Sequence, residues 1–356
     1  MQKPILRKML AMLFAMLLVP AAAFADMSVT YDTSTPQNPI LIKAGDQLIA
    51  ISMGQSFSNA PLLSVLAQMQ AKAIDLWIIA GISDQAFASV GNVLSTVTVH
   101  NVWLDQTLQN SPALTSLFDT QGTKRSDASA QNTLSIGDAQ ITFENSSSTG
   151  TALRIGYGNT GFAFFSTPSL IKGSALLNNS DLIYITGSDP NEPFAIESAR
   201  PALVVLDSAS FSKDYAGAMA QTLASKGFTV LMDTGAAFSM VSNGQEISLS
   251  GISAYGLINK AKVNVRSAPS VDAGRAAGLT KNDAVQITGL AAAKTAGEYW
   301  FQIAINGRTS YVRSDLVTQA NPNDQQALKS QVGKAAVKKT PKPTVDTTSG
   351  ATKKKH

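Results

Sequence analysis

No residue of this 356-residue chain is a cysteine. The chain can therefore form no disulfide, and it has no thiol to which a lipid anchor could be attached. Without cross-links, the burial of apolar side chains must hold the fold together, and 44% of the residues are hydrophobic. A prior of about 150 residues per domain predicts two domains.

The first 25 residues have the pattern of a secretory signal peptide. Three basic residues lie within the first eight, residues 9–19 are apolar, and Ala23 and Ala25 supply small side chains at positions −3 and −1. This pattern predicts cleavage before Asp26 and a protein that is periplasmic or secreted. The apolar run is short for a membrane span of about 20 residues, so an uncleaved anchor is the less favoured alternative. No transmembrane helix is expected after cleavage.

Charge divides the chain into an acidic body and a basic end. Residues 26–255 contain 9 Lys and Arg against 18 Asp and Glu, residues 256–320 contain 8 against 4, and residues 321–356 contain 8 against 2. An acidic body disfavours nucleic acid as a partner, because affinity for a phosphate backbone comes largely from Lys and Arg. Residues 321–356 lack a hydrophobic pattern, which predicts a disordered basic tail. Such a tail is more often simply solvated than bound to anionic lipid or wall polymer.

Residues 255–317 form a series of short strand-like runs. Residues 263–266 alternate in polarity and stop at a loop, and Asn306-Gly307 is a tight-hairpin signal before a return strand. Residues 299–305 form the strongest strand pattern. Alternation places Phe301, Ile303 and Ile305 on one face of that strand, with Trp300 and Gln302 on the other.

These residues carry a family resemblance. The stretch VNVRSAPS at 263–270 resembles the "lNVRsgPs" opening of bacterial SH3 (SH3b) domains, and YWFQI…NGR…YV at 299–312 resembles their "W-x-k-V…dGrtGWV" hairpin. The resemblance implies that residues 256–320 form a small barrel of five to six strands. It also implies non-catalytic binding of peptides, peptidoglycan or proteins. Tyr299, Trp300 and Tyr311 are the candidate groove residues, although Trp300 could instead pack on the first loop of its own barrel.

Residues 26–252 alternate strand-like and helix-like segments. Helical spacing predicts helices at 61–71, 87–94 and 212–226. Apolar or alternating runs predict strands at 48–51, 74–80, 141–145, 153–157, 162–165, 181–186, 202–206 and 229–232.

The order of these segments resembles the metallo-β-lactamase superfamily, most closely the hydrolase domain of the DNA-uptake competence proteins. The stretches that carry the resemblance are IDLWII at 74–79, LRIGYGNT at 153–160, SDLIYI at 180–185, RPALVVL at 200–206 and GFTVLMDT at 227–234. The resemblance implies an α+β chain in which an αββα sandwich at 26–252 precedes the small all-β barrel.

The metal ligands of that superfamily have no counterparts in this sequence. Residue-by-residue alignment places the ligand positions on side chains without imidazole or carboxylate, namely Gly81, Ser83, Gln85, Ala86, Thr167, Gly187 and Ser188. The chain has two histidines, His100 and the terminal His356, whereas a catalytic zinc needs about three protein ligands. The sequence therefore predicts no metal, no cofactor and no catalytic residue, with His100 as an ordinary strand-end residue.

Two other kinds of site are compatible with the sequence of the large domain. Clustered carboxylates could bind Mg²⁺ or Ca²⁺ near the mouth of the former metal site, and the candidates are Asp84, Asp181, Asp189, Asp207 and Asp233. The small neutral side chains at the former ligand positions could also leave a pocket for a ligand.

Taken together, the sequence predicts a non-catalytic exported binding or scaffold protein. Its barrel would recognise a cell-wall peptide or an envelope protein partner. The alternatives are an accessory factor that handles DNA in the periplasm, and a hydrolase with an unrecognised carboxylate site.

Overall fold

The computed structural model describes residues 26–332 except for certain internal positions. Those positions are 32–38, 54–56, 127–132, 147–149, 167, 172, 179, 186–202, 207–212, 226–227, 233–237, 253, 293–298 and 320–324. The expected signal peptide at 1–25 and the end of the expected tail at 333–356 lie outside the described residues.

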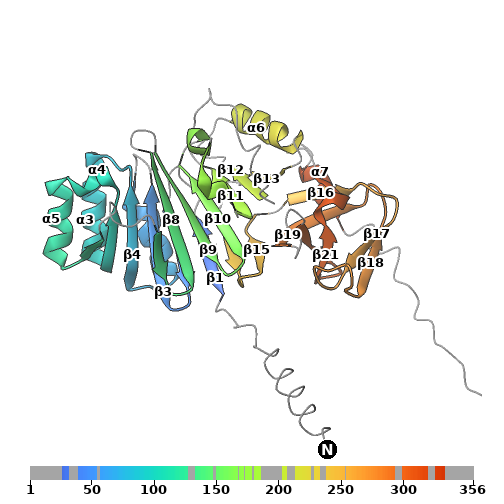
Figure 1. The fold of residues 1–356 in the computed structure, drawn as a ribbon, viewed down its shortest axis with the longest axis horizontal. Helices are drawn as coiled ribbons and strands as arrows, with labels where there is room; N and C mark the ends of the chain where they lie inside the picture. Colours follow the sequence, from blue (N-terminus) through green and yellow to red (C-terminus); the bar gives the residue numbers. More distant parts are fainter. Residues whose placement is uncertain are drawn as a thin grey trace, which may run out of the picture.

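The large domain consists of two sheets that face each other (Figure 1). Its part of the first sheet has the order β15-β14-β1-β2-β3-β4-β5-β6, and the second sheet has the order β13-β12-β11-β10-β9-β8-β7. The first-sheet strands are β1 (Met27–Tyr31), β2 (Ile40–Ala44), β3 (Gln47–Met53), β4 (Ala73–Ala80), β5 (Thr98–Leu104), β6 (Lys124–Ser126), β14 (Phe238–Ser242) and β15 (Glu246–Ser250). Those of the second sheet are β7 (Thr133–Ile136), β8 (Ala139–Ser146), β9 (Gly150–Tyr157), β10 (Thr160–Phe165), β11 (Leu182–Ile185), β12 (Leu203–Leu206) and β13 (Thr229–Met232).

Helices cover the outer face of each sheet (Figure 1). The first sheet is covered by α2 (Asn59–Gln68), α3 (Phe87–Thr96) and α5 (Pro112–Gln121), and the second by α6 (Lys213–Ser225). The shorter helices are α4 (Gln106–Gln109) and the 3₁₀ helices η1 (Asp84–Ala86), η2 (Pro168–Ile171), η3 (Ala175–Leu177) and η5 (Ser314–Leu316). These layers are the αββα sandwich predicted from the sequence.

Strand β4 shows how the sequence produces these layers. Leu76 and Ile78 point into the core between the two sheets, and Trp77 and Ile79 point into the core under the helices. A strand buried on both faces reads as a continuous apolar run, which is why residues 74–80 could be recognised as a strand. Trp77 donates its indole N–H to Ser52 Oγ at 2.9 Å, so its polar atom is satisfied within the core.

The C-terminal barrel follows the large domain. Its strands are β16 (Ala254–Ile258), β17 (Val263–Arg266), β18 (Arg275–Leu279), β19 (Ala284–Ala292), β20 (Tyr299–Ile305), β21 (Arg308–Arg313) and β22 (Val317–Gln319). Asn306 and Gly307 form the expected two-residue turn between β20 and β21, with φ angles of 50° and 73°. Positive φ at both turn residues is what a type I′ hairpin requires.

A helix lies beyond the predicted boundary at residue 320. Helix α7 (Gln325–Lys329) lies within the stretch that the sequence assigned to a disordered tail. Its Leu328 is buried against Tyr255 and Ala284 of the barrel. A single well-placed leucine is too weak a pattern to predict a helix, but its burial is enough to hold one turn against the barrel.

The two domains share one sheet. Strand β15 at the edge of the sandwich pairs antiparallel with β19 of the barrel, with Glu246 opposite Ala291, Ile247 opposite Leu290 and Ser248 opposite Gly289. The order β18-β17-β21-β20-β19-β15-β14 therefore runs without interruption from the barrel into the sandwich (Figure 1). We call this contact the domain joint.

Candidate functional site

A carboxylate from the sandwich is bound by polar side chains of the barrel at the domain joint. Glu246 Oε2 accepts a hydrogen bond from Gln302 Nε2 at 2.7 Å and another from the Tyr311 hydroxyl at 2.8 Å. Gln302 Oε1 in turn accepts from Ser248 Oγ at 3.1 Å. Gln302 is only 4% exposed, so this network is satisfied inside the joint rather than by solvent.

The two backbones approach closely beside this network, and Gly289 permits the approach. A Cβ atom added at Gly289 would lie 2.3 Å from the carbonyl oxygen of Ile247 and 2.4 Å from Gln302 Oε1. The β19–β20 pairing is also irregular between Ile287 and Gly289. A bulge with a glycine at a close backbone contact is a common device in sheets. Because Gly289 has no side chain, β19 can pair with β15 at this short distance.

The alternation predicted for β20 is correct, but the second face of the strand is not free. Phe301 and Ile303 are buried in the main core and Ile305 packs at its edge, as expected. Trp300 lies on the other face and is only 5% exposed. That face also carries Gln302, which contacts Glu246 of the sandwich. The exposed aromatic platform that the sequence suggested is therefore not found at Trp300.

Tyr299 extends the joint to a buried carboxylate of the second sheet. Burial, together with the negative charge of Asp181, raises the pKa of Tyr299 to about 12. Burial also raises the pKa of Asp181 to about 6, against the opposing effects of the Gly161 N–H and of Arg154. The Gly161 N–H donates to Asp181 Oδ2 at 2.8 Å. The three candidate groove residues Tyr299, Trp300 and Tyr311 thus all lie at or beside the domain joint, and ligand binding by them stays a prediction.

Asp181 does not occupy the place assigned to it in the carboxylate hypothesis. It directly precedes β11, whereas positions 187 and 188 follow the carboxyl end of that strand. A four-residue strand spans about 13 Å, so Asp181 lies at the wrong end for the former metal site. Asp84 begins η1 after β4, and the other three candidates, Asp189, Asp207 and Asp233, lie outside the described residues.

At Gly81, one of the positions aligned with the metal ligands, the backbone is held by a carboxylate from another segment. The Gly81 N–H donates to Asp105 Oδ2 at 2.5 Å, and φ at Gly81 is 65°. Asp105 also caps α4 by accepting from the N–H groups of Thr107 and Leu108, both at 2.9 Å. Asp105 therefore ties the end of β4 to the start of α4, a role that the sequence analysis did not assign.

The side chains at the former ligand positions do not fit a zinc ion. Ser83 precedes η1, Gln85 is exposed and Ala86 is buried with only a methyl group to offer. Thr167, Gly187 and Ser188 lie outside the described residues. Across the part of the chain that the structure describes, no group of three or more His, Cys, Asp or Glu residues is arranged to hold a metal ion. His100 is an exposed residue of β5.

Comparison with known proteins identifies the C-terminal barrel. Residues 261–318 match the family model described as the bacterial SH3 domain. This segment is a bacterial SH3 domain. It contains β17 through the first two residues of β22, including the whole β20–β21 hairpin. No curated protein matches the sequence of the chain.

Solved structures with the metallo-β-lactamase fold are similar to the sandwich. The metallo-β-lactamase fold protein YhfI from Bacillus subtilis is 17% identical, with 61% of this chain and 100% of that chain covered and a TM-score of 0.46. Zn²⁺-bound PqqB from Methylobacterium extorquens is 11% identical, with 54% and 82% covered and a TM-score of 0.38. Human tRNase Z, short form, is 9% identical, with 51% and 92% covered and a TM-score of 0.34.

No helix within the described ranges is both long enough and apolar enough to cross a bilayer.

Proposed function

We propose that this protein is exported and acts as a non-catalytic binding protein of the cell envelope, with its bacterial SH3 domain as the recognition module. The observation that carries the proposal is the bacterial SH3 domain at residues 261–318, because a small barrel of this kind suggests binding rather than chemistry. The signal-peptide pattern of residues 1–25 supports a location in the periplasm or outside the cell.

The sandwich is proposed to be a scaffold that holds the barrel in one orientation. The β15–β19 ladder and the hydrogen bonds of Glu246 support this role, because they join the domains by both backbone and side-chain contacts. The side chains of Gly81, Ser83, Gln85 and Ala86 support a pseudoenzyme, since none of them resembles a zinc ligand. A fold without its site gives little guidance on activity.

The ligand proposed for the barrel is a cell-wall peptide or an envelope protein. If this ligand uses Trp300 together with Tyr311, it must first displace Glu246 from Gln302 and Tyr311, whereas Tyr299 lies on the opposite face of β20. Wall peptides carry free carboxylates, so they present the same chemical group that Glu246 places there. An acidic peptide is therefore a suitable competitor for this position.

Retention on isolated wall sacculi and on immobilised envelope proteins tests this proposal. The chain that begins at Asp26, which contains every described residue, is expected to be retained on one of the two. Glu246→Gln should increase that retention, because the joint loses its charge while the side chain keeps its shape. Retention on neither material would contradict the proposed function. Unchanged retention of Glu246→Gln would place recognition on another surface of the barrel.

Metal analysis tests the non-catalytic part of the proposal. We expect no stoichiometric zinc or manganese in the purified protein, measured by elemental analysis. Phosphodiesterase or lactamase activity that EDTA abolishes would show that the chain is an enzyme.

Expression with the native N-terminus in a bacterial host, followed by mass spectrometry, should give a chain that begins at Asp26.

A further inference from the structure

Four lysines that form no ion pair with another described residue gather at one end of the barrel. Lys260, Lys262, Lys281 and Lys329 are all exposed. The ion pairs among the described residues are Arg125–Asp119 at 3.2 Å and Arg313–Asp315 at 2.9 Å, and none of the four lysines takes part in them. We call these four residues the basic end of the barrel.

Backbone hydrogen bonds bring the turns that carry these lysines together. The Ile258 N–H donates to the Asp283 carbonyl at 3.0 Å, and the Asn282 N–H donates to the Ile258 carbonyl at 2.8 Å. The loop with Lys260 and Lys262 therefore lies directly beside the turn with Lys281. Helix α7 adds Lys329 to the same end, because the preceding Leu328 packs on Ala284, the first residue of β19.

The carboxylates at this end are already engaged. Asp283 accepts hydrogen bonds from the Thr280 N–H at 2.7 Å and the Thr280 hydroxyl at 3.0 Å. Asp315 pairs with Arg313, which neutralises it. Of these two carboxylates only Asp283 keeps a charge that no ion pair neutralises, so the four lysines leave this end with a net positive charge.

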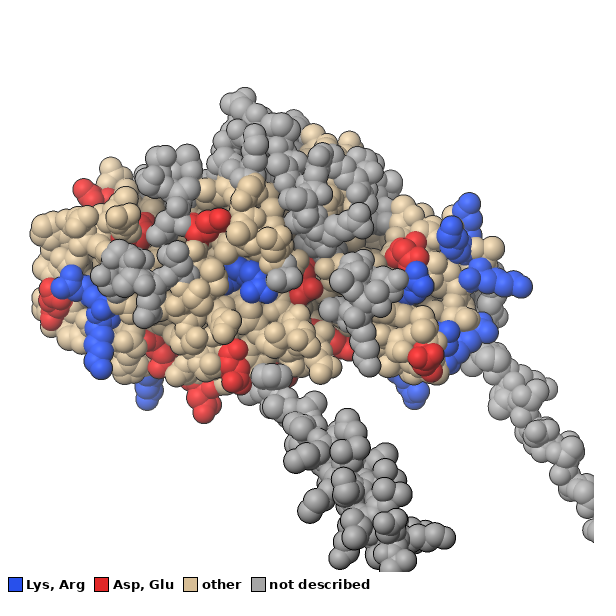
Figure 2. Space-filling view, viewed as in Figure 1, with Lys and Arg blue, Asp and Glu red and all other residues tan. Residues whose placement is uncertain are grey.

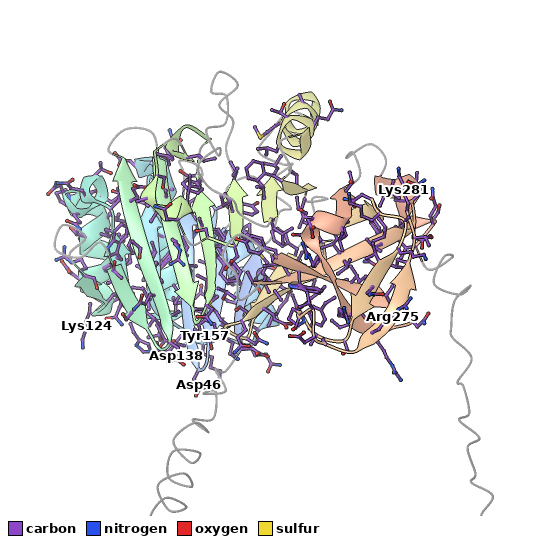
Figure 3. The ribbon with its side chains drawn as sticks, turned by 45° about the vertical axis from the view of Figure 1, so that its right-hand side comes forward. Asp46, Lys124, Asp138, Tyr157, Arg275 and Lys281 are labelled. Carbon is purple, nitrogen blue, oxygen red and sulfur yellow. The ribbon has the colours of Figure 1, made fainter. Side chains whose placement is uncertain are left out.

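The figures place this charge away from the sandwich. Figure 2 shows Lys and Arg side chains gathered over the end of the barrel that is remote from the sandwich. In Figure 3, Lys281 and Arg275 lie on that end, whereas Lys124 lies at the opposite end of the molecule. Because the joint covers the Gln302 face of the barrel, the basic end is a part of the barrel that stays accessible.

We infer that the basic end of the barrel docks on an anionic phospholipid surface. Lysine ammonium groups are compact, hydrated point charges, which suit lipid phosphates that are presented without fixed geometry. Single-stranded nucleic acids are usually recognised with exposed aromatic rings in addition to charge. The described aromatic residues of the barrel are buried or partly buried. The patch therefore offers charge without a stacking platform, which favours a lipid surface over a single-stranded nucleic acid.

The sequence after α7 reinforces this choice. Residues 333–356 contain seven lysines and one aspartate, and they follow directly from the helix that packs on the basic end. A folded basic patch followed by a polybasic segment adds further lysines to the same end of the chain, and clusters of about four to eight Lys or Arg residues are typical of segments that bind anionic lipid. This inference goes beyond the proposed function, because it concerns a different surface and a different partner.

Sedimentation with lipid vesicles tests the inference. The chain from Asp26 to His356 should bind vesicles that contain phosphatidylglycerol and should not bind pure phosphatidylcholine vesicles. Binding should fade as salt rises from about 0.1 M to about 1 M, where the Debye length falls from about 10 Å to about 3 Å. Replacing Lys260, Lys262 and Lys281 with Gln should weaken binding roughly 100-fold, since each lysine near the surface contributes about a fivefold factor.

Matched variants separate this patch from charge in general. Lys43, Lys72 and Lys124 are exposed lysines of the sandwich, and their triple replacement with Gln changes the net charge by the same amount. That variant should bind as well as the wild type, and Arg at the three barrel positions should restore binding. A chain that ends at Val332 should retain part of the binding and remain sensitive to the barrel triple variant.

Several outcomes would overturn the inference. One is an equal loss of vesicle binding in the barrel and sandwich triple variants. Another is complete loss of vesicle binding when the tail is removed, with no effect of replacing the barrel lysines. Binding of the barrel lysines to sacculi or to DNA, but not to vesicles, would replace the lipid with that polymer. Each of these results is independent of whether Tyr299, Trp300 and Tyr311 bind a wall peptide, so the two proposals can fail separately.

Discussion

Glu246 connects the two domains by accepting hydrogen bonds from Gln302 and Tyr311. The contact with Tyr311 could not be predicted from the local sequence pattern. The sequence predicts Tyr299, Trp300 and Tyr311 as candidate groove residues, because large aromatic side chains can serve as ligand contacts. The sequence does not reveal the partners of these residues, because Glu246 is separated from Tyr311 by 65 residues and belongs to the other domain. A hydrogen bond of this range depends on the placement of two strands, which no local pattern specifies.

Tyr311→Phe is expected to weaken the joint without removing the ring. It deletes one donor to a carboxylate, and a hydrogen bond to a charged group contributes about 1.5–3 kcal/mol. Urea unfolding of the wild type, Tyr311→Phe, Glu246→Ala and the double variant gives the coupling between the two residues, because Ala leaves no acceptor for the Tyr311 hydroxyl. Losses that simply add in the double variant would show that the hydrogen bond contributes nothing to stability.

Asp181→Asn should change the pH dependence of stability. The folded pKa of Asp181 is raised by burial to about 6 from 3.8, so the folded state binds this proton more tightly than the unfolded chain does. The contribution of the group to the free energy of unfolding is therefore largest below about pH 4 and is lost as the pH rises to about 6. Asn carries no charge to bury and can still accept from the Gly161 N–H.

The variant should consequently be more stable than the wild type at pH 7, by about 1–3 kcal/mol for a shift of this size. Urea unfolding at pH 4, 5, 6 and 7 measures the difference. A variant that loses stability equally at every pH would indicate that the carboxylate is needed for its hydrogen bonds rather than penalised for its charge.

At the scale of elements, the sequence predicted the helices α2, α3 and α6 and eight of the fifteen described strands of the sandwich. β4 and β20 were readable because one is apolar on both faces and the other alternates with a two-residue turn after it. Helix α5 was not assigned, although Ser111 caps its first turn and Gly122 ends it with φ of 69°. It has ten residues, like α2 and α3, and its apolar residues Leu114, Leu117 and Phe118 recur at helical spacing, so the pattern was present in the sequence and was missed.

The β15–β19 ladder depends on Gly289, and a side chain there should disrupt it. Gly289→Ala would place a methyl group 2.3 Å from the Ile247 carbonyl oxygen, a contact that backbone atoms can relieve only by moving apart. We expect a loss of about 1–3 kcal/mol in the free energy of unfolding, as for overpacked cores.

Gly217 provides the matched control for this substitution. It lies in helix α6, and a Cβ atom added there meets no atom within 4 Å. Gly217→Ala should therefore stabilise the protein by about 0.4–1 kcal/mol. Urea unfolding measures both variants. A Gly289→Ala variant as stable as the wild type would mean that the two strands do not meet as closely as the structure shows.

At the scale of the whole molecule, two sequence modules form one structural unit. The αββα layers and the barrel were both predictable from patterns, but their fusion into one sheet was not. The ladder that fuses them uses backbone N–H and C=O groups, which every residue carries. It also protects β15 from being an open edge strand. The main hydrophobic core also extends through both domains, since it contains Ile78 and Leu153 of the sandwich together with Phe301 of the barrel.

This continuity predicts that the sandwich and the barrel unfold together. Phe301 is 3% exposed and belongs to the core that both domains share. Phe301→Ala should cost about 3–5 kcal/mol, as for other core aromatic residues. If the domains are coupled, that loss should lower the unfolding temperature of the sandwich as well as that of the barrel, in a single calorimetric transition.

The three tryptophans of the chain allow the two domains to be observed separately. Trp77 and Trp103 are buried in the sandwich and Trp300 is buried in the barrel. In a Trp300→Phe background, tryptophan fluorescence therefore reports on the sandwich alone. Adding Phe301→Ala to this background should shift the fluorescence transition to lower temperature, because the barrel can no longer support the joint. A fluorescence transition that stays in place while calorimetry shows a second, earlier peak would mean that the barrel unfolds independently and that the shared sheet does not couple the domains.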